Sequence, residues 1–192
     1  MQIREDVLTP GKVYHIYNRG VNSKLVFLNS ENMSFFLRKA SYYLLPVFDI
    51  YAYCLMPNHF HFILQPKIES DRRPQQFKEK GLHSENSLYS KAIGKLISSY
   101  TQAFNKVYQR SGSVFESPFK RIAVETEEYL RNLIIYVHQN PADFRNHRFS
   151  SYRSIISNAE TSICRERVLE LFGGKNNFII CHNIEADHPL NA

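Results

Sequence analysis

Hydrophobic and polar positions follow two different periods along this chain, and these periods predict where strands and helices lie. Short stretches rich in β-branched and aromatic residues, bounded by turn residues, are typical of β-strands. They occupy residues 13–17, 48–55, 59–65 and 114–124, and the last is interrupted near Pro118. Apolar residues spaced three and four apart indicate amphipathic helices. One helix is expected between a Ser30 N-cap and Pro46, a second over residues 87–110, and a third from a Thr126 N-cap to about Asn140.

The predicted order is strand, helix, strand, strand, helix, strand, helix. This order is typical of an α+β, ferredoxin-like (RRM-like) fold, in which an antiparallel sheet carries helices on one face. The tight turn Met56-Pro57-Asn58 should join the two middle strands into a hairpin. The last helix is an addition to this pattern. We therefore expect one domain over residues 1–150 and an irregular, partly helical extension over residues 151–192.

Composition indicates an ordinary globular protein. The chain has 192 residues, of which 43% are hydrophobic and 22% charged, and this balance argues against a disordered chain. The apolar runs are too short to cross a bilayer, and the first residues do not resemble a signal peptide. A cytoplasmic location is therefore expected. Cys54, Cys164 and Cys181 form no CxxC pair, which argues against a disulfide framework or a cysteine-based zinc site. Cys54 is expected to be a small core residue in its strand.

The charge of the chain favours a polyanionic partner. The formal net charge is +6, and the pI is about 9.2. Residues 91–121 contain six basic residues and one acidic residue, so most of the positive excess falls in this stretch. Aromatic residues are interleaved with the basic ones, although their helical spacing places most of them toward a core. Nucleic acid is therefore the partner class that the charge distribution favours.

Two histidines in the third strand form a candidate metal site. His59 and His61 are two residues apart, so they point to the same face of a strand, whereas Phe60 points to the core. Two imidazoles about 7 Å apart along one face can share a divalent ion. The alternative is that both are exposed polar residues on a strand with one face in solvent. Two ligands are too few for a tight site, so a third ligand is required.

The last helix offers that third ligand. Tyr136 and Asn140 are one turn apart, at the edge of the apolar face of this helix. Asn140 could give an amide oxygen to an ion held by His59 and His61, with Tyr136 beside it. His138 faces elsewhere on the helix. Taken from the helix alone, the alternative for Tyr136 is an ordinary tyrosine at the edge of the core.

The same residues carry a resemblance to a known family. Residues 53–64, Tyr-Cys-Leu-Met-Pro-Asn-His-Phe-His-Phe-Ile-Leu, resemble the HUH motif of single-tyrosine transposases, with Phe60 as the bulky hydrophobic residue. This family includes transposases of single-strand-transposing insertion sequences and REP-associated tyrosine transposases. Residues 136–141, Tyr-Val-His-Gln-Asn-Pro, are similar to its tyrosine motif, and residues 14–21 and 149–154 also match. The following residues, Ala142-Asp143-Phe144-Arg145, depart from the family pattern.

The resemblance implies an activity and roles for these residues. Tyr136 would attack a DNA phosphodiester and form a 5′-phosphotyrosine with a free 3′-OH, while His59, His61 and Asn140 would hold a divalent metal. Imidazole with amide and phosphate oxygens suits Mg²⁺ or Mn²⁺. The substrate would be single-stranded DNA, with a hairpin near the cleavage site. The residues expected to hold that DNA are Arg19, Arg72, Arg73, Lys95, Lys120 and Arg121.

Two alternatives remain open at this point. A non-catalytic, ferredoxin-like module that binds single-stranded nucleic acid would explain the charge equally well. A metal-dependent hydrolase that uses water would explain the histidines without requiring Tyr136. The oligomeric state is also open, since a homodimer could assemble the helix and the sheet in trans.

Overall fold

The computed structural model describes residues 7–71 and 85–186, and the side chains of residues 85–87 are not described. Within these ranges the elements follow in the order β1 (Val13–Arg19), α1 (Ser30–Leu44), β2 (Phe48–Met56), β3 (His59–Pro66), α2 (Glu85–Val107), β4 (Lys120–Val124), α3 (Glu127–Gln139), α4 (Tyr152–Ile156), α5 (Arg165–Leu171) and α6 (Lys175–Cys181). Two short 3₁₀ helices, η1 (Val21–Ser23) and η2 (Glu69–Asp71), follow β1 and β3.

The four strands form one antiparallel sheet in the order β2-β3-β1-β4. β2 and β3 make the predicted hairpin, and β1 lies between β3 and β4. This is the strand order of a ferredoxin-like fold, so the predicted fold class is confirmed. The consequence for function is that β3, which carries the histidine pair, is a central strand and is hydrogen-bonded on both edges.

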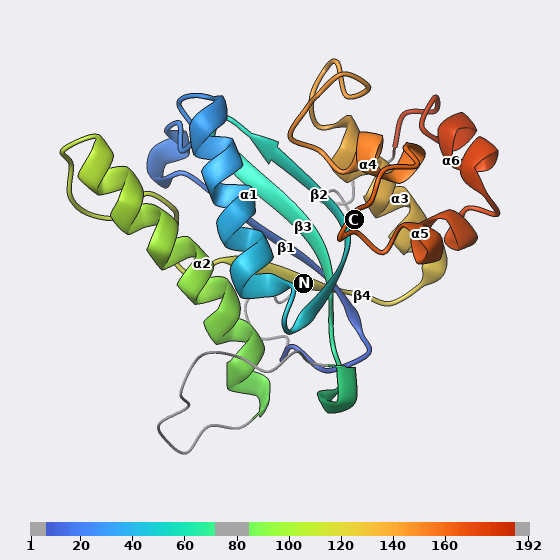
Figure 1. The fold of residues 1–192 in the computed structure, drawn as a ribbon, viewed down its shortest axis with the longest axis horizontal. Helices are drawn as coiled ribbons and strands as arrows, with labels where there is room; N and C mark the ends of the chain where they lie inside the picture. Colours follow the sequence, from blue (N-terminus) through green and yellow to red (C-terminus); the bar gives the residue numbers. More distant parts are fainter. Residues whose placement is uncertain (1–6, 72–84, 187–192) are drawn as a thin grey trace.

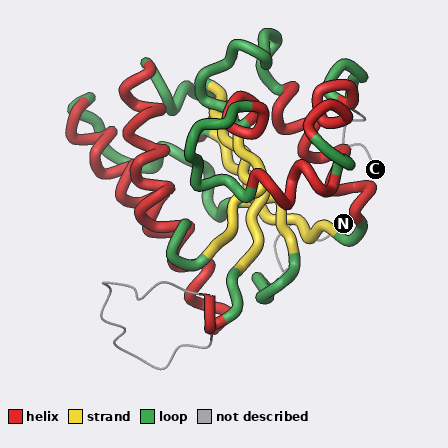
Figure 2. Tube along the Cα trace, turned by 45° about the vertical axis from the view of Figure 1, so that its right-hand side comes forward, coloured by secondary structure: helices red, strands yellow, loops and turns green. Residues whose placement is uncertain are grey.

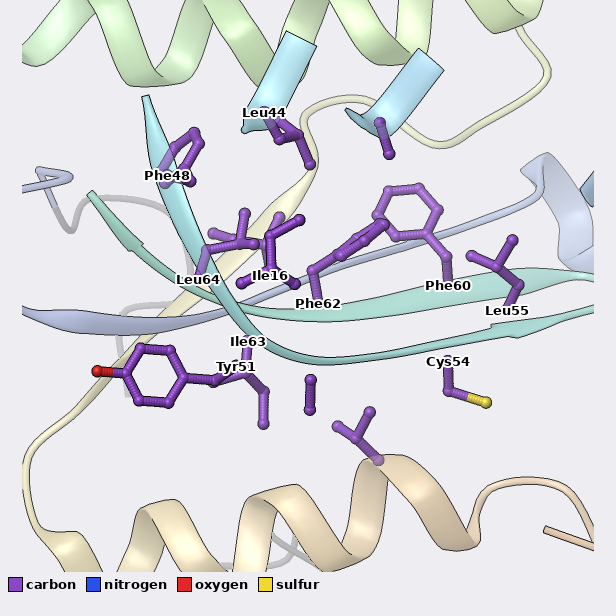
Figure 3. Close-up of a cluster of buried hydrophobic side chains, with 14 of the residues drawn as sticks. Ile16, Leu44, Phe48, Tyr51, Cys54, Leu55, Phe60, Phe62, Ile63 and Leu64 are labelled. Carbon is purple, nitrogen blue, oxygen red and sulfur yellow. The ribbon is translucent and has the colours of Figure 1, made fainter. Parts of the chain in front are cut away.

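Helices cover both faces of the sheet. α1 and α2 lie together on one side, whereas α3 and the helices that follow it lie on the other (Figure 1). The sheet therefore lies between two groups of helices (Figure 2). Buried Phe60 and Phe62 point toward α1 and α2, while buried Cys54 and Ile63 point toward α3 (Figure 3). This alternation confirms Cys54 as a core residue, and it leaves His59 and His61 on the α3 side of the sheet.

The α3 helix begins and packs as the sequence predicts. The hydroxyl of Thr126 accepts a hydrogen bond from the Tyr129 backbone N–H at 3.1 Å, which confirms the predicted N-cap. The apolar stripe of the helix is fully buried, and its members are Leu130, Leu133, Ile134 and Val137. Because that stripe faces the sheet, the residues at its edge are held close to the sheet surface.

Two local predictions are wrong. The N-cap of α1 is Asn29 rather than Ser30, because the Asn29 side chain reaches the backbone N–H of Asn32 at 2.9 Å. The fourth strand begins at Lys120 rather than Val114. Before it, only an isolated bridge joins Phe115 to Gly20 in the described part of the chain. Pro118, which has no backbone N–H to donate, interrupts the pairing.

The region after residue 150 packs against α3. Tyr152 and Phe178 are buried and belong to the same hydrophobic cluster as the sheet residues. Their rings stack with centroids 5.7 Å apart. The core is thus continuous across residue 150. Among the described helices, none is both long and apolar enough to span a membrane.

Candidate active site

The two histidines of β3 lie on one face of the sheet, as predicted from strand alternation. Their ring centroids are 5.0 Å apart, and the rings are nearly perpendicular. His59 is half-buried, whereas His61 is only 4% exposed. The pair lies on the α3 side of the sheet, opposite the aromatic core beneath α1 and α2.

The end of α3 brings two further side chains to this pair within one chain. The Tyr136 ring meets the His61 ring edge to face, with centroids 5.9 Å apart. Asn140 is the C-cap of the helix, and its Oδ1 lies 3.2 Å from His59 Nε2. The four residues that the sequence placed in one composite site are therefore neighbours in space.

Hydrogen bonds fix the orientation of the groups around His59. Asn140 Nδ2 donates to the Tyr136 carbonyl oxygen at 3.0 Å, so its Oδ1 is turned toward His59. His59 Nδ1 lies 2.7 Å from Asn58 Oδ1, so the ring is held between two amide oxygens. Burial lowers the pKa of His59, against an opposing effect of the hydrogen bond with Asn140. A neutral ring carries one proton and can donate to only one of these two amide oxygens. When the proton is on Nδ1, His59 Nε2 and Asn140 Oδ1 are two acceptors that face each other.

Two acceptors held 3.2 Å apart are an arrangement that a cation would satisfy. Two ligands at about 2.1 Å and at right angles around one ion are about 3.0 Å apart, close to the observed separation. Neutral imidazole and an amide oxygen are donors that Mg²⁺ or Mn²⁺ accepts. Among the described residues, no group of three His, Cys, Asp or Glu side chains could hold a metal. The third donor here would instead be the amide of Asn140.

His15 on β1 completes the surroundings of His61, and its role was not found from the sequence. It is completely buried, and its Nε2 lies 2.8 Å from His61 Nδ1. Its ring also stacks on Tyr17, with centroids 4.7 Å apart. Burial lowers the pKa of His15 to about 3, so the ring stays neutral, and one proton is shared between His15 Nε2 and His61 Nδ1. When His61 Nδ1 donates this proton, its lone pair is on Nε2, which is the tautomer that metal binding requires. His15 then carries its own proton on Nδ1, a buried atom without a hydrogen-bond partner in the described structure.

The phenol of Tyr136 is protonated at neutral pH. Burial raises the pKa of Tyr136, and a hydrogen bond with Asn140 acts in the opposite direction. The pKa of the neighbouring Tyr17 is also raised, first by burial and then by the proximity of Tyr136. A nucleophilic role for Tyr136 therefore requires a cation or a base close to its oxygen.

Two of the basic residues expected to hold DNA lie on the face of the imidazoles. Arg19 is opposite His59 in the β1–β3 register, and it forms an ion pair with Glu116 at 2.6 Å. Lys120 is opposite Tyr17, and its Nζ lies 5.6 Å from the centre of that ring. Both residues are therefore placed where a phosphate backbone crossing this face would pass.

The other expected DNA contacts lie elsewhere. Arg121 alternates with Lys120 along β4 and donates to the Ser90 hydroxyl of α2 at 3.0 Å. Arg121 thus points to the opposite face of the sheet from the imidazoles, so the expectation that it holds DNA beside Lys120 is wrong. Lys95 is exposed on α2, in that same helical layer, and its contact with DNA stays a prediction. Arg72 and Arg73 lie outside the described residues.

His138 faces away from the imidazole pair, as the helical geometry predicts. It is fully buried, with Nδ1 2.9 Å from His182 Nε2 and Nε2 2.7 Å from the Ser151 hydroxyl. Burial lowers the pKa of His138 well below its ordinary value, and the nearby His182 adds to this effect. The two imidazoles join α3 to the end of α6. Strand and helix periods gave no signal for this pair, because its partners are 44 residues apart.

Comparisons with known proteins give one informative match. No family model matches the chain, and no curated protein matches it in sequence. One matching solved structure is described as "Structure of the REP associates tyrosine transposase bound to a REP hairpin". The match has a TM-score of 0.59 and 14% sequence identity, and it covers 82% of this chain and 87% of that chain. At this identity the likeness is one of fold, so the chain has the fold of a REP-associated tyrosine transposase, the family that its two motifs resemble.

Proposed function

We propose that this protein is a metal-dependent, single-stranded DNA endonuclease and strand transferase of the transposase type. The observation that carries the proposal is the close approach of His59 Nε2 and Asn140 Oδ1, 3.2 Å apart, with Tyr136 one helical turn away. The aromatic contact between Tyr136 and His61 places the phenol beside the second imidazole. The fold likeness to a transposase bound to a hairpin supports the same activity.

In this mechanism the residues divide into holders of the ion and the attacking group. His59, His61 and Asn140 would hold Mg²⁺ or Mn²⁺, which polarises the scissile phosphate when bound. The Tyr136 oxygen gives its proton to a water molecule and forms a bond to phosphorus, while the bond from phosphorus to the 3′-oxygen breaks. That oxygen takes up a proton and leaves as a 3′-OH, and the strand stays attached to Tyr136 through its 5′-phosphate. The phosphotyrosine retains the bond energy, so another 3′-OH can later reseal the strand.

The surroundings of the site favour a single-stranded substrate. Arg19 and Lys120 lie on the imidazole face and can contact a phosphate backbone. The half-buried Tyr17 ring lies between Lys120 and His61 in the strand register, and unpaired bases stack on such rings. The solved structure with the same fold was bound to a hairpin. We therefore propose single-stranded DNA next to a hairpin as the substrate.

One gel experiment separates this function from its alternatives. Labelled single-stranded DNA is incubated with the protein and Mn²⁺, and the products are resolved in denaturing detergent. The proposed function gives a covalent protein–DNA band and a free 3′-OH fragment. A hydrolase that uses water gives free 5′-phosphate ends without that band, and a binding module gives no cleavage.

A matched pair of variants tests the nucleophile. Tyr136→Phe should still bind the oligonucleotide but form no covalent band. Tyr129→Phe is the control, because Tyr129 lies on the same helix and its buried hydroxyl has no hydrogen-bond partner in the described structure. A covalent band that persists in Tyr136→Phe, or disappears equally in both variants, would contradict the assignment.

A further inference from the structure

A pocket of about 500 Å³ opens next to the proposed nucleophile. Tyr136 and Asn140 form one wall, together with the loop that follows α3. The opposite wall is the segment after α6, residues 182–186. The volume falls in the usual range for small-molecule sites, about 300–1,000 Å³. A nucleotide joined to a phosphate at Tyr136 could therefore extend into this space.

The far wall of the pocket is held in place by specific contacts. Gln139 Nε2 donates to the carbonyl oxygens of His182 and Ile184, at 3.1 and 2.8 Å. Its Oε1 accepts from the Ala186 backbone N–H at 2.9 Å. The buried contact between His138 and His182 adds a further bond from α3 to the same segment. The pocket is thus built from two parts of the chain that are tied to each other, which favours a preformed site.

The polar groups of the pocket fit a nucleobase better than a phosphate. The Arg145 guanidinium lies 4.5 Å from the centre of the buried Phe144 ring and donates to Asn183 Oδ1. It therefore presents a flat cation at a fixed place, on which a base can stack. Glu185 also lines the pocket, and its carboxylate would repel a phosphate. A carboxylate accepts from the exocyclic amine of a base, and Arg donates to base acceptors, so the pocket offers both halves of base recognition.

We propose that this pocket binds one unpaired nucleobase of the cleaved strand, adjacent to the scissile phosphate, and gives the enzyme a base preference there. This proposal rests on the proposed nuclease function. It assigns a role to the residues after Pro141, Ala142-Asp143-Phe144-Arg145, where the sequence departs from the family pattern. Arg145 and Glu185 would be the residues that determine specificity.

The test is a selection by covalent capture. The full chain is incubated with Mn²⁺ and a library of single-stranded DNA that contains a randomised segment. The DNA fragments attached to protein and the released fragments that end in a 3′-OH are both recovered and sequenced. Their ends define the cleavage point, to which the sequences are aligned. Wild-type protein should enrich one base at a position within a few nucleotides of that point. In Arg145→Gln and Glu185→Gln this enrichment should fall by between about fivefold and a hundredfold, the range for one base contact.

A matched control removes the same charge outside the pocket. Arg148 lies over Phe149 at 5.6 Å, in the same loop, but is not part of the pocket wall. Arg148→Gln should leave the base preference unchanged. If the base preference survives in both pocket variants, or is lost to the same extent in Arg148→Gln, the pocket proposal is overturned. The nuclease function is then left intact, because the adduct still forms. Absence of any adduct with wild-type protein instead overturns the nuclease function itself.

Discussion

Replacing His15 tests whether a second histidine sets the state of the proposed metal ligand His61. His15→Phe keeps a flat ring in the stack between Tyr17 and His61 but removes the acceptor 2.8 Å from His61 Nδ1. A proton on His61 Nδ1 would then have no acceptor at position 15, so the neutral ring carries its proton on Nε2. A protonated Nε2 cannot bind a metal, so metal binding must force the less favourable tautomer.

The size of the effect follows from the cost of that buried donor. His61 is 4% exposed, so water cannot replace the lost acceptor. An unsatisfied buried donor costs about 1–3 kcal/mol, which corresponds to about 5- to 150-fold weaker metal binding. Mutations of the residues that orient metal ligands typically cost about 10–100-fold in affinity, which is the same range. The expected loss for His15→Phe is therefore about one to two orders of magnitude in the Kd for Mn²⁺.

Isothermal titration with Mn²⁺, in the absence of DNA, measures this loss without relying on activity. His15→Gln is the matched control, because its amide oxygen can accept from His61 Nδ1–H, and it should regain most of the affinity. Thermal unfolding of each variant establishes that it is folded. If folded His15→Phe binds Mn²⁺ within about twofold of wild type, or if His15→Gln binds as weakly as His15→Phe, the tautomer argument is refuted.

Three further predictions concern stability and DNA binding. Burial lowers the pKa of His182 to about 4, so between about pH 6.5 and pH 4 the unfolded chain binds a proton that the folded chain does not bind. Because of this residue, the free energy of unfolding should fall by about 1.4 kcal/mol per pH unit as the pH drops from about 6.5 to about 4. In urea unfolding, His182→Gln should lack this contribution. Above pH 7 its free energy of unfolding should vary with pH as that of the wild type does. Thr126→Ala should lower the free energy of unfolding by about 0.5–2 kcal/mol through loss of the α3 cap, and an unchanged urea midpoint would contradict this. Lys120→Gln should reduce the slope of log affinity for single-stranded DNA against log salt by about 1, while exposed Lys175→Gln on α6 should not change it.

Local periodicity paired the four principal site residues, but it left ordinary alternatives open for each pair, and the family resemblance supplied their roles. His59 and His61 share a face because strand side chains alternate, and Tyr136 and Asn140 are neighbours because a helix repeats near every fourth residue. The fold class followed from the order of the elements. That the helix edge meets the strand face was suggested by the family resemblance, and the structure brings the two together within one chain.

The residues that sequence reasoning missed depend on contacts between elements. Alternation already placed His15 on one face of its strand, but only the pairing of β1 with β3 shows that it lies beside His61. Asn58 was taken as a turn residue, whereas its side chain also bonds to His59 Nδ1. Arg121 was misplaced for the same reason. Its proximity to Lys120 in sequence suggested one site, yet alternation sends the two side chains to opposite faces.

The position of Tyr136 depends on both sides of α3, which makes the C-terminal helices part of the active-site architecture. The apolar stripe of α3 packs on the sheet, while His138, two residues after Tyr136, is bonded to His182 at the end of α6. A displacement of about 1 Å at a reacting group can reduce a rate about 100-fold. Loss of the buried histidine pair would let α3 shift or rotate on the sheet, since apolar contacts fix the rotation of a helix less tightly than a directional hydrogen bond does. Variants of His182 should therefore lower the rate of adduct formation even though the side chain of His182 bonds to His138 and not to a proposed metal ligand.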